Sequence, residues 1–216
     1  SYYFARREGF KVEITDCKIK HNEKNFFRKI GPAILGSSIV QINSWIDVLI
    51  ASFISSAVSY LYYAERLVQL PLALIGTAIG TASLPALSKL IQKKQENQVI
   101  NLQNKAISIS LFFAIPAAIA LYILAEPIIA TLFNRGEFMA DEVTNASKAL
   151  ALYAFALPAF ILSKILSVSF YAKGDTKTPM KITASCVLLN LILNLILIRH
   201  FSFLGIVIAT IISSWC

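Results

Sequence analysis

The stretch SYLYYAERLVQLPLALIGTAIGTASLP, residues 59–85, is apolar enough for the centre of a lipid bilayer, yet it carries Glu65 and Arg66 side by side. Placing an arginine at the centre of a membrane helix costs ~2.5–3.5 kcal/mol on insertion scales, so such a residue usually faces a cavity or a partner. What surrounds Arg66 therefore depends on the other apolar segments of the chain.

The composition is that of a membrane protein. Hydrophobic residues make up 56% of the 216 positions and charged residues only 15%, whereas about a quarter of a soluble domain is charged. Residues 106–125, 182–198 and 201–216 hold no charge, and residues 30–54 hold only Asp47. Runs of about 20 apolar residues predict membrane helices, because lone strands leave backbone groups unsatisfied in hydrocarbon. We expect an all-α, polytopic transmembrane helix bundle.

Six helices are predicted along the chain. They lie near residues 30–54, 58–87, 105–133, 143–172 and 182–198, and from residue 203 onward. Residues 1–29 are expected to hold the end of a preceding helix and a basic cytoplasmic loop, and residues 30–216 the transmembrane region. Both ends of the chain look cut, so we expect a fragment of a longer protein.

Basic residues predict the orientation of these helices. The opening segment and the loops near residues 88–105 and 173–181 carry fifteen Lys and Arg, while the alternate loops carry two. By the positive-inside rule, the basic loops face the cytoplasm. This distribution also explains the net charge of +8, so we expect no nucleic-acid partner.

Polar and small residues form one stripe along the second predicted helix. Spacings of three and four residues place them on one face, and they are Ser59, Tyr62, Arg66, Gln69, Ala73, Gly76 and Gly80. In one interpretation the stripe lines a water-filled cavity, where the guanidinium of Arg66 binds an anion with its bidentate fork. In the other, Arg66 forms a salt bridge that fixes helix packing. Glu65 points about 100° away and is free to pair elsewhere.

Four further residues in the apolar segments are candidates for gating or packing. Pro71 lies inside a predicted helix and is expected to bend it. Gly76 and Gly80 form a G-x-x-x-G pattern that lets another helix approach closely. We favour packing for these three, although a bend there would suit a moving gate. Lys164 lies deep in the fourth helix, where it neutralises an acid, lines the cavity or packs its stem.

Oxygen-bearing side chains recur in three of the predicted helices. Gln41, Ser44 and Asp47 lie near one face of the first helix, Asn190 and Asn194 lie one turn apart, and Thr210 belongs to the last helix. A carboxylate, amide oxygens and a hydroxyl suit a small hard cation such as Na⁺. On spacing alone a hydrogen-bonded helix interface is the favoured interpretation.

The sequence holds no catalytic motif. It has no Ser/His/Asp grouping, no phosphate-cradling glycine loop and no metal motif, and its three cysteines lack metal-ligand spacing. We therefore expect a protein that is not an enzyme and has no cofactor beyond a coupling ion.

Five segments resemble the MurJ (MviN) family of bacterial lipid II flippases, which belongs to a superfamily with the MATE drug exporters and polysaccharide flippases. The resemblance covers nearly the whole chain. The segments are GPAILGSSIVQINSWIDVLIASFI (31–54), SYLYYAERLVQLPLALIGTAIGTASLPALS (59–88), LFNRGEF (132–138), LPAFILSKILSVSFYAKGDTKTPMK (157–181) and LNLILNL (189–195).

The resemblance implies about fourteen helices in two bundles, of which this chain would supply the end of the sixth to an incomplete twelfth. It places Arg66 at the cavity arginine of the second bundle. The other cavity candidates are Gln41, Ser44, Ser59, Tyr62, Glu65 and Gln69. In some family members a Na⁺ site joins the seventh, eleventh and twelfth helices. By position it would use Asp47, Asn190, Asn194, Thr210 and the carbonyl of Ile206. Some members carry Asp at the position of Asn194, so this chain has one negative charge fewer at the site.

The resemblance further implies a flippase that moves the anionic lipid II headgroup from the inner to the outer leaflet by alternating access. The headgroup would meet Arg66 while the polyprenyl tail stays among membrane lipids. Na⁺ or the membrane potential, at ~2.3 kcal/mol per charge per 100 mV, would reset the cycle. The expected location is the bacterial cytoplasmic (inner) membrane, and the missing N-terminal bundle is an expected partner. The alternatives are a cation-coupled MATE-like drug exporter and a flippase of another polyprenyl-linked oligosaccharide.

Overall fold

A computed structural model describes residues 21–54, 56–133 and 140–216, with side chains for Ile34 and from Ser38 onward. Every regular element within these ranges is helical, which confirms the all-α prediction. The elements are α2 (His21–Ser52), α3 (Ala57–Pro71), the π-helical η1 (Leu72–Thr77), α4 (Ala78–Gln92), α5 (Glu96–Ile123), α6 (Ala125–Phe133), α7 (Ala140–Ala154), α8 (Leu157–Ala172), α9 (Lys177–Phe201) and α10 (Phe203–Ser214).

Several of these helices are suited to a bilayer. Among the described residues, Ala57–Gln92, Glu96–Ile123 and Lys177–Phe201 are long and apolar enough to span a membrane. The pair α7 and α8 is a fourth span if its 45° bend lies within one crossing, and Ser38–Ser52 and Phe203–Ser214 are shorter apolar helices. The chain is therefore a polytopic membrane protein, and each of the six predicted segments is helical.

Two segments that were predicted as single helices are each broken. The helix expected over 105–133 divides at Leu124 into α5 and α6, and the helix expected over 143–172 divides at 155–156 into α7 and α8. A proline follows each break, Pro127 and Pro158. Proline lacks an amide hydrogen and is tolerated in the first turn of a helix, so these prolines mark helix starts inside apolar runs.

The other boundaries also differ. Helix α2 already includes His21, ahead of the start expected near residue 30, so helical backbone extends into the segment expected to hold a basic loop. The division at residue 29 itself stays a prediction. Pro71 was expected to make its helix irregular, and η1 follows it directly. The wider π-helical turn lets the chain continue past a residue that cannot donate a backbone hydrogen bond.

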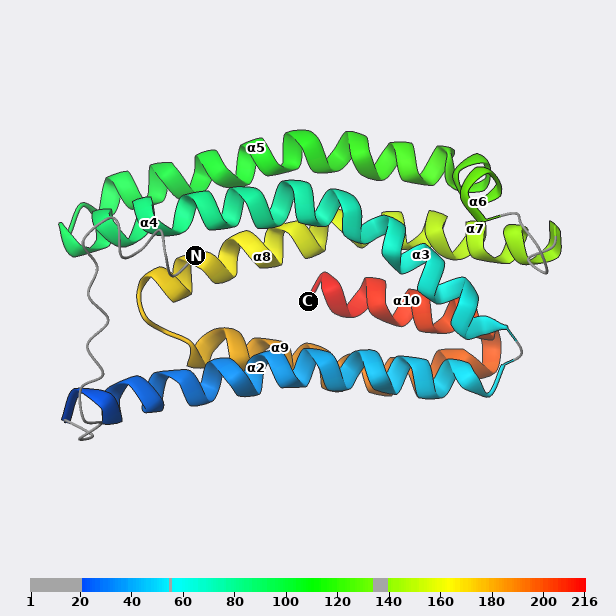
Figure 1. Cartoon of the computed structure of the whole chain (residues 1–216), viewed down its shortest axis with the longest axis horizontal. Helices are drawn as coiled ribbons and strands as arrows, with labels where there is room; N and C mark the ends of the chain where they lie inside the picture. Colours follow the sequence, from blue (N-terminus) through cyan, green and yellow to red (C-terminus); the bar gives the residue numbers. More distant parts are fainter. Residues whose placement is uncertain (1–20, 55, 134–139) are drawn as a thin grey trace, which may run out of the picture.

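The helices form two groups with α10 between them (Figure 1). The continuous α3–η1–α4 packs with α5, α7 and α8, while α2 lies along α9. α10 packs on α9 and on α7. The indole Nε1 of Trp215 donates a hydrogen bond of 3.1 Å to the carbonyl of Phe155, at the α7–α8 break. This bond ties the end of α10 to a carbonyl that no regular helix satisfies.

The turns alternate between two ends of the bundle (Figure 1). The turns after α4 and α8, which carry Lys93 and Lys173, lie at one end. The turns after α2 and α9 lie at the opposite end. This placement agrees with the alternation that the basic residues predicted. We call the Lys93 end the inner end and the opposite one the outer end.

Small residues set the distance between α8 and the long helix. A Cβ atom at Gly76 would meet the Cγ1 of Ile161 at 3.5 Å, and one at Gly80 would meet the Cγ2 of Val168 at 3.3 Å. The G-x-x-x-G pair therefore lies directly against α8. This contact also sets Ile161 level with Gly76 along the bundle.

Candidate functional site

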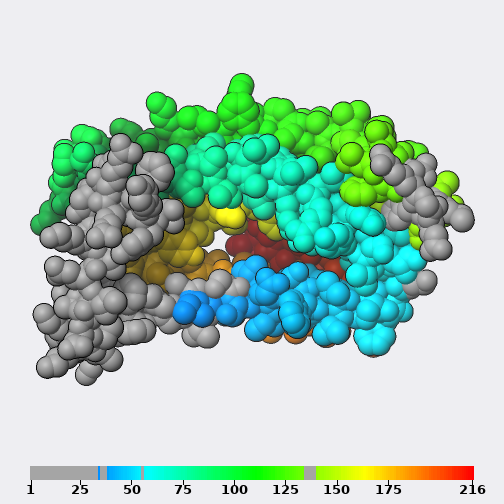
Figure 2. Space-filling model, viewed as in Figure 1, coloured from blue at the N-terminus to red at the C-terminus, as the bar shows by residue number. Residues whose placement is uncertain are grey.

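A cavity of about 1140 Å³ lies between the two helix groups. Figure 2 shows it as a hollow between α2 and the α3–η1–α4 helix. Most of the predicted site residues line it, namely Gln41, Ser44, Asp47, Tyr62, Glu65, Arg66, Gln69, Gly76, Gly80, Lys164 and Thr210. The cavity lining does not include Ser59, Pro71, Asn190, Asn194 or Ile206. Of these, Ser59 is exposed at the start of α3 and Asn190 and Asn194 are buried behind the cavity wall.

The Arg66 side chain is held by neighbours on its own helix. Its Nη1 donates to the Oε1 of Gln69 at 3.1 Å, and its guanidinium carbon lies 4.8 Å from the ring centroid of Tyr62. The Nε2 of Gln69 donates to the Oε1 of Glu65 at 2.9 Å. One amide therefore orients both charged groups. The partner of Glu65, which the sequence left open, is Gln69 on the same helix.

This arrangement follows from the pattern of α3. Tyr62, Arg66 and Gln69 are three or four residues apart and so share a face, while Ala64 and Leu67 are buried on the opposite side. Among the described residues no acid forms an ion pair with Arg66. The salt-bridge interpretation is therefore not supported, and a positive charge stays exposed to the cavity.

A second polar cluster joins α2, α9 and α10. The Nδ2 of Asn194 donates to the Oδ1 of Asp47 at 2.6 Å and to the Oδ1 of Asn190 at 2.9 Å. The Nδ2 of Asn43 donates to the Oδ2 of Asp47 at 3.3 Å. The Nδ2 of Asn190 donates to the hydroxyls of Thr210 and Ser213 at 3.3 and 3.2 Å. Four residues predicted from spacing alone are thus in contact.

The oxygens of this cluster are not satisfied by hydrogen bonds alone. The Oδ1 of Asn190 lies 3.1 Å from the Oδ1 of Asn43 and 3.2 Å from the Oδ1 of Asp47. Turning the Asn190 amide would place its nitrogen 2.9 Å from the nitrogen of Asn194. If the Asn194 amide were turned as well, its oxygen would lie 2.6 Å from the Oδ1 of Asp47. Either choice leaves like atoms in contact, and the Oδ1 of Asn194 is buried without a partner.

A cation among these oxygens would remove the conflict, because oxygen ligands may face one another around a hard cation. The donor set therefore fits Na⁺. The carbonyl of Ile206 already accepts a hydrogen bond from Thr210 at 3.0 Å, so its predicted role as a ligand would require Thr210 to turn its hydroxyl.

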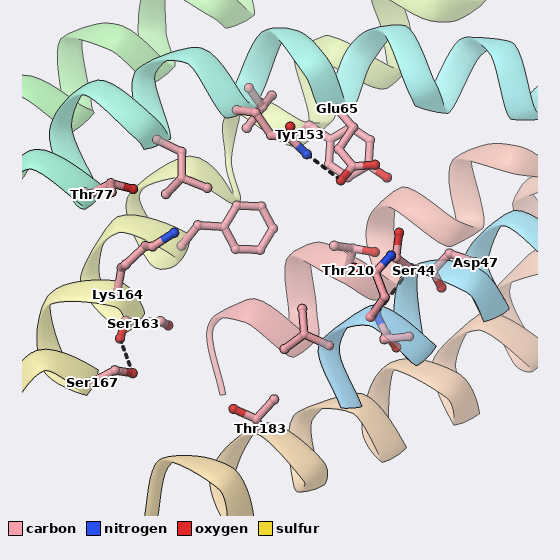
Figure 3. Close-up of a pocket in the computed structure, with 18 of the residues that line it drawn as sticks. Ser44, Asp47, Glu65, Thr77, Tyr153, Ser163, Lys164, Ser167, Thr183 and Thr210 are labelled. Atoms are coloured by element: carbon pink, nitrogen blue, oxygen red, sulfur yellow. Dashed lines mark hydrogen bonds between the residues drawn. The ribbon is translucent and has the colours of Figure 1, made fainter. Parts of the chain in front are cut away.

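Two side chains near this cluster were missed or not developed from sequence. Tyr153 on α7 is buried, interacts with the Thr210 side chain and lines the same cavity as Glu65 and Asp47. Figure 3 shows Tyr153 beside Glu65, with Asp47 and Thr210 across the cavity. Ser213 belongs to the last apolar segment of the chain and was not among the predicted site residues. No spacing signal marked Tyr153, because its neighbours in the sequence are apolar.

Lys164 lies at the inner part of the cavity. Figure 3 shows its side chain extending from α8 into the cavity, near Thr77, Ser163 and Ser167. Of the three interpretations left open for this lysine, the structure supports the one in which it lines the cavity.

Comparison with protein families gives a match over the whole chain. The family profile described as "Lipid II flippase MurJ" matches residues 1–216. The chain is 41% identical over 192 residues to the "Probable lipid II flippase MurJ" of Rickettsia prowazekii (strain Madrid E), covering 89% of the chain and 38% of that protein. It is 37% identical over 187 residues to the "Lipid II flippase MurJ" of Burkholderia cenocepacia, covering 86% of the chain and 36% of that protein. The chain thus spans well under half the length of these relatives.

Solved structures agree with this match. A structure described as "Lipid II flippase MurJ, inward closed conformation" aligns with a TM-score of 0.77 at 29% identity, covering 98% of the chain and 45% of that structure. The Vibrio cholerae MATE transporter VcmN aligns with a TM-score of 0.78 at 19% identity, covering 99% of the chain and 49% of that structure. The second likeness concerns the fold alone.

Proposed function

Because the chain belongs to the MurJ family of lipid II flippases, we propose that it forms one wall of the cavity through which such a flippase moves the lipid II headgroup. The headgroup passes from the inner to the outer leaflet of the bacterial cytoplasmic membrane. The chain binds and moves its substrate without chemical conversion.

One observation carries this proposal. Arg66 is exposed to a large cavity, and no acid among the described residues pairs with it. The planar fork of a guanidinium matches two phosphate oxygens. Gln69 and Tyr62 hold this fork in place before substrate arrives, which lowers the entropy cost of binding. Arg66 would therefore bind the pyrophosphate.

The polyprenyl tail stays outside the cavity. The described helices expose large apolar side chains on their outer faces, among them Phe112, Phe113 and Ile119 of α5. In a bilayer such faces contact lipid. The tail would remain among membrane lipids while the headgroup crosses. The cavity would be completed by the N-terminal bundle that the family resemblance implies.

Alternating access would reorient this wall against the other bundle. Asp47, Asn190, Asn194 and Thr210 would hold Na⁺, with Asn43 as an additional oxygen donor. A bound Na⁺ would supply positive charge that neutralises Asp47 and ties α2, α9 and α10 together. The membrane potential would act on the same charged elements, at ~2.3 kcal/mol per charge per 100 mV.

The electrostatics of the cavity favour an anionic substrate over a cationic drug. Asp47 and Glu65 line the described part of the cavity, and amide groups already bind both. Arg66 and Lys164 line it without an acidic partner among the described residues. An exporter of cationic drugs would instead need acids without a partner and basic residues that are paired with acids.

The proposal is tested in cells depleted of their own lipid II flippase. The full-length protein carrying this chain is supplied as native, Arg66→Ala, Arg66→Lys or Ser59→Ala, and outer-leaflet lipid II is measured chemically. Charge-assisted hydrogen bonds are strong, so Arg66→Ala should reduce transport by about 10–100-fold at equal membrane abundance. Ser59→Ala, outside the cavity, should behave as native.

Arg66→Lys keeps the positive charge but removes the planar guanidinium. Normal transport by this variant would mean that the charge is sufficient. Full rescue by Arg66→Ala would mean that Arg66 is a packing residue. Failure of the native protein at normal abundance, together with no binding of lipid II by the purified protein, would rule out the flippase assignment. A polyprenyl-linked oligosaccharide that binds in its place would indicate the other flippase class.

A further inference from the structure

Hydroxyl side chains from three helices line the inner part of the cavity, where one lysine also lies. Thr77 ends η1, Ser163 and Ser167 belong to α8, and Thr183 belongs to α9. Figure 3 shows Thr77, Ser163 and Ser167 near Lys164 and Thr183 farther from it, with Lys164 on the opposite side of the view from Glu65 and Asp47. The cavity therefore has two polar regions of different composition.

Lys164 has no counter-charge in the part of the chain that the structure describes. No hydrogen bond or ion pair of this lysine occurs there, and Asp47 and Glu65 are the acids that line the cavity. Both acids belong to the other region and are bound by amides. An ionisable group at membrane depth is costly and marks a functional position by default.

The backbones that carry Arg66 and Lys164 lie at well separated levels along the cavity, so the two side chains are suited to different parts of one extended ligand. Ile161 packs against Gly76, which lies ten residues beyond Arg66 along a continuous helix. At ~1.5 Å per residue this is ~15 Å. Lys164 follows Ile161 by three further residues, so the two levels differ by about 15–20 Å. About five or six extended peptide residues span that distance at ~3.3 Å each.

The chemistry of the inner region suits a carboxylate. The lysine ammonium is a compact charge with three donors, which binds a carboxylate as a point charge. Serine and threonine hydroxyls donate and accept hydrogen bonds, as recognition of peptide amides and sugar hydroxyls requires. The Oγ of Ser167 donates to the carbonyl of Ser163 at 2.7 Å, so its lone pairs remain available to a ligand donor.

We propose that Lys164 and the surrounding hydroxyls form a second subsite, which binds a carboxylate on the peptide of the substrate headgroup while Arg66 binds the pyrophosphate. This proposal rests on the lipid II flippase function proposed above. It assigns the two ends of one extended anionic headgroup to two separate regions of the cavity. Recognition at Lys164 would select substrates that carry the peptide.

The test compares ligands that differ in the peptide. The purified full-length protein is titrated with lipid II, with lipid II whose peptide carboxylates are amidated, and with undecaprenyl pyrophosphate, which has no peptide. Lys164→Ala should weaken binding of lipid II by about 10-fold or more and leave undecaprenyl pyrophosphate within about twofold. Arg66→Ala should weaken binding of both. Amidated lipid II should bind native protein as weakly as lipid II binds Lys164→Ala.

Two variants control for fold and charge. Lys164→Arg should recover most of the lipid II affinity, because a cation remains at the same place. Lys148→Ala removes a lysine that is exposed on α7 and outside the cavity lining, and should change neither affinity. Thermal unfolding of each variant shows whether it is folded.

The outcomes separate the subsite from the function. Equal weakening of both ligands by Lys164→Ala would mean a general positive potential and would overturn the subsite. Unchanged binding of lipid II by Lys164→Ala, with native binding intact, would overturn it as well. Absence of lipid II binding by the native protein would instead overturn the proposed function itself.

Discussion

The close approach of α9 and α10 makes Gly205→Ala a severe substitution. A Cβ atom at Gly205 would lie 2.6 Å from the carbonyl carbon and oxygen of Leu197 and 2.9 Å from the nitrogen of Ile198. These are backbone atoms, so no side chain can turn aside and the two helices must separate. Gly80→Ala is the matched control, because its Cβ meets only a side-chain atom, the Cγ2 of Val168, at 3.3 Å.

The expected magnitudes differ for the two positions. Alanine is favoured over glycine within a helix by ~1 kcal/mol, while overpacking costs about 1–3 kcal/mol. Because the clash at Gly205 is with backbone, we expect a net loss of ~2 kcal/mol. The unfolding entropy grows with chain length, and this chain covers only 38% of its Rickettsia prowazekii relative. The same loss therefore lowers the unfolding midpoint of the full-length protein by about 2–4 °C. At Gly80 the two effects nearly cancel, so the change should stay within about 1 kcal/mol.

The assay is thermal unfolding of the purified full-length protein in detergent, for native and both variants. The separation of α9 from α10 should also weaken the hydrogen bond between Asn190 and Ser213, which is 3.2 Å long across the same helix pair. Any Na⁺-dependent increase of the midpoint should therefore shrink in Gly205→Ala and persist in Gly80→Ala. A Gly205→Ala protein that unfolds within about 1 °C of native would refute the close contact between these helices.

Two further predictions concern charge. Asp175 accepts hydrogen bonds from the Thr178 hydroxyl and amide and from the Lys177 amide, which hold the pKa of its carboxyl below the usual value. The stabilisation should be complete above a pH of about 3.9 and lost as pH falls through the lowered pKa. Unfolding midpoints between pH 3 and 7 should therefore depend less on pH in Asp175→Asn, and identical profiles would contradict this. Asn194→Asp adds a carboxylate beside Asp47, at a contact that is 2.6 Å long in the native chain. Repulsion between the two carboxylates should lower the unfolding midpoint without Na⁺, and Na⁺ should then stabilise this variant more than native. An equal effect of Na⁺ on both proteins would argue against the site.

Much of the fold was predictable because the bilayer restricts the choice of structure. Hydrocarbon offers no partner for backbone groups, so long apolar runs must be helical. The Lys and Arg distribution then predicted which loops share one end of the bundle. The face of α3 that carries Tyr62, Arg66 and Gln69 was also predictable, since residues three and four apart share a helix face.

The helix breaks were not predictable from apolar content. Pro127 and Pro158 lie in largely apolar segments, where a proline can kink a helix or start a new one. Only packing decides between these outcomes. The same holds for Glu65, because whether Gln69 binds one charged neighbour or both depends on side-chain rotamers and not on spacing.

The sequence by itself determined an all-helical membrane protein, the face that carries Arg66 and membership of the MurJ family, because these depend on composition, periodicity and local motifs. Tertiary structure decided which polar groups meet. Asp47 contacts Asn194 across 147 positions of the chain, Tyr153 reaches Thr210 from another helix, and Lys164 faces a cavity whose acids lie elsewhere. Contacts between distant segments depend on how whole helices pack, and a one-dimensional pattern does not contain that information.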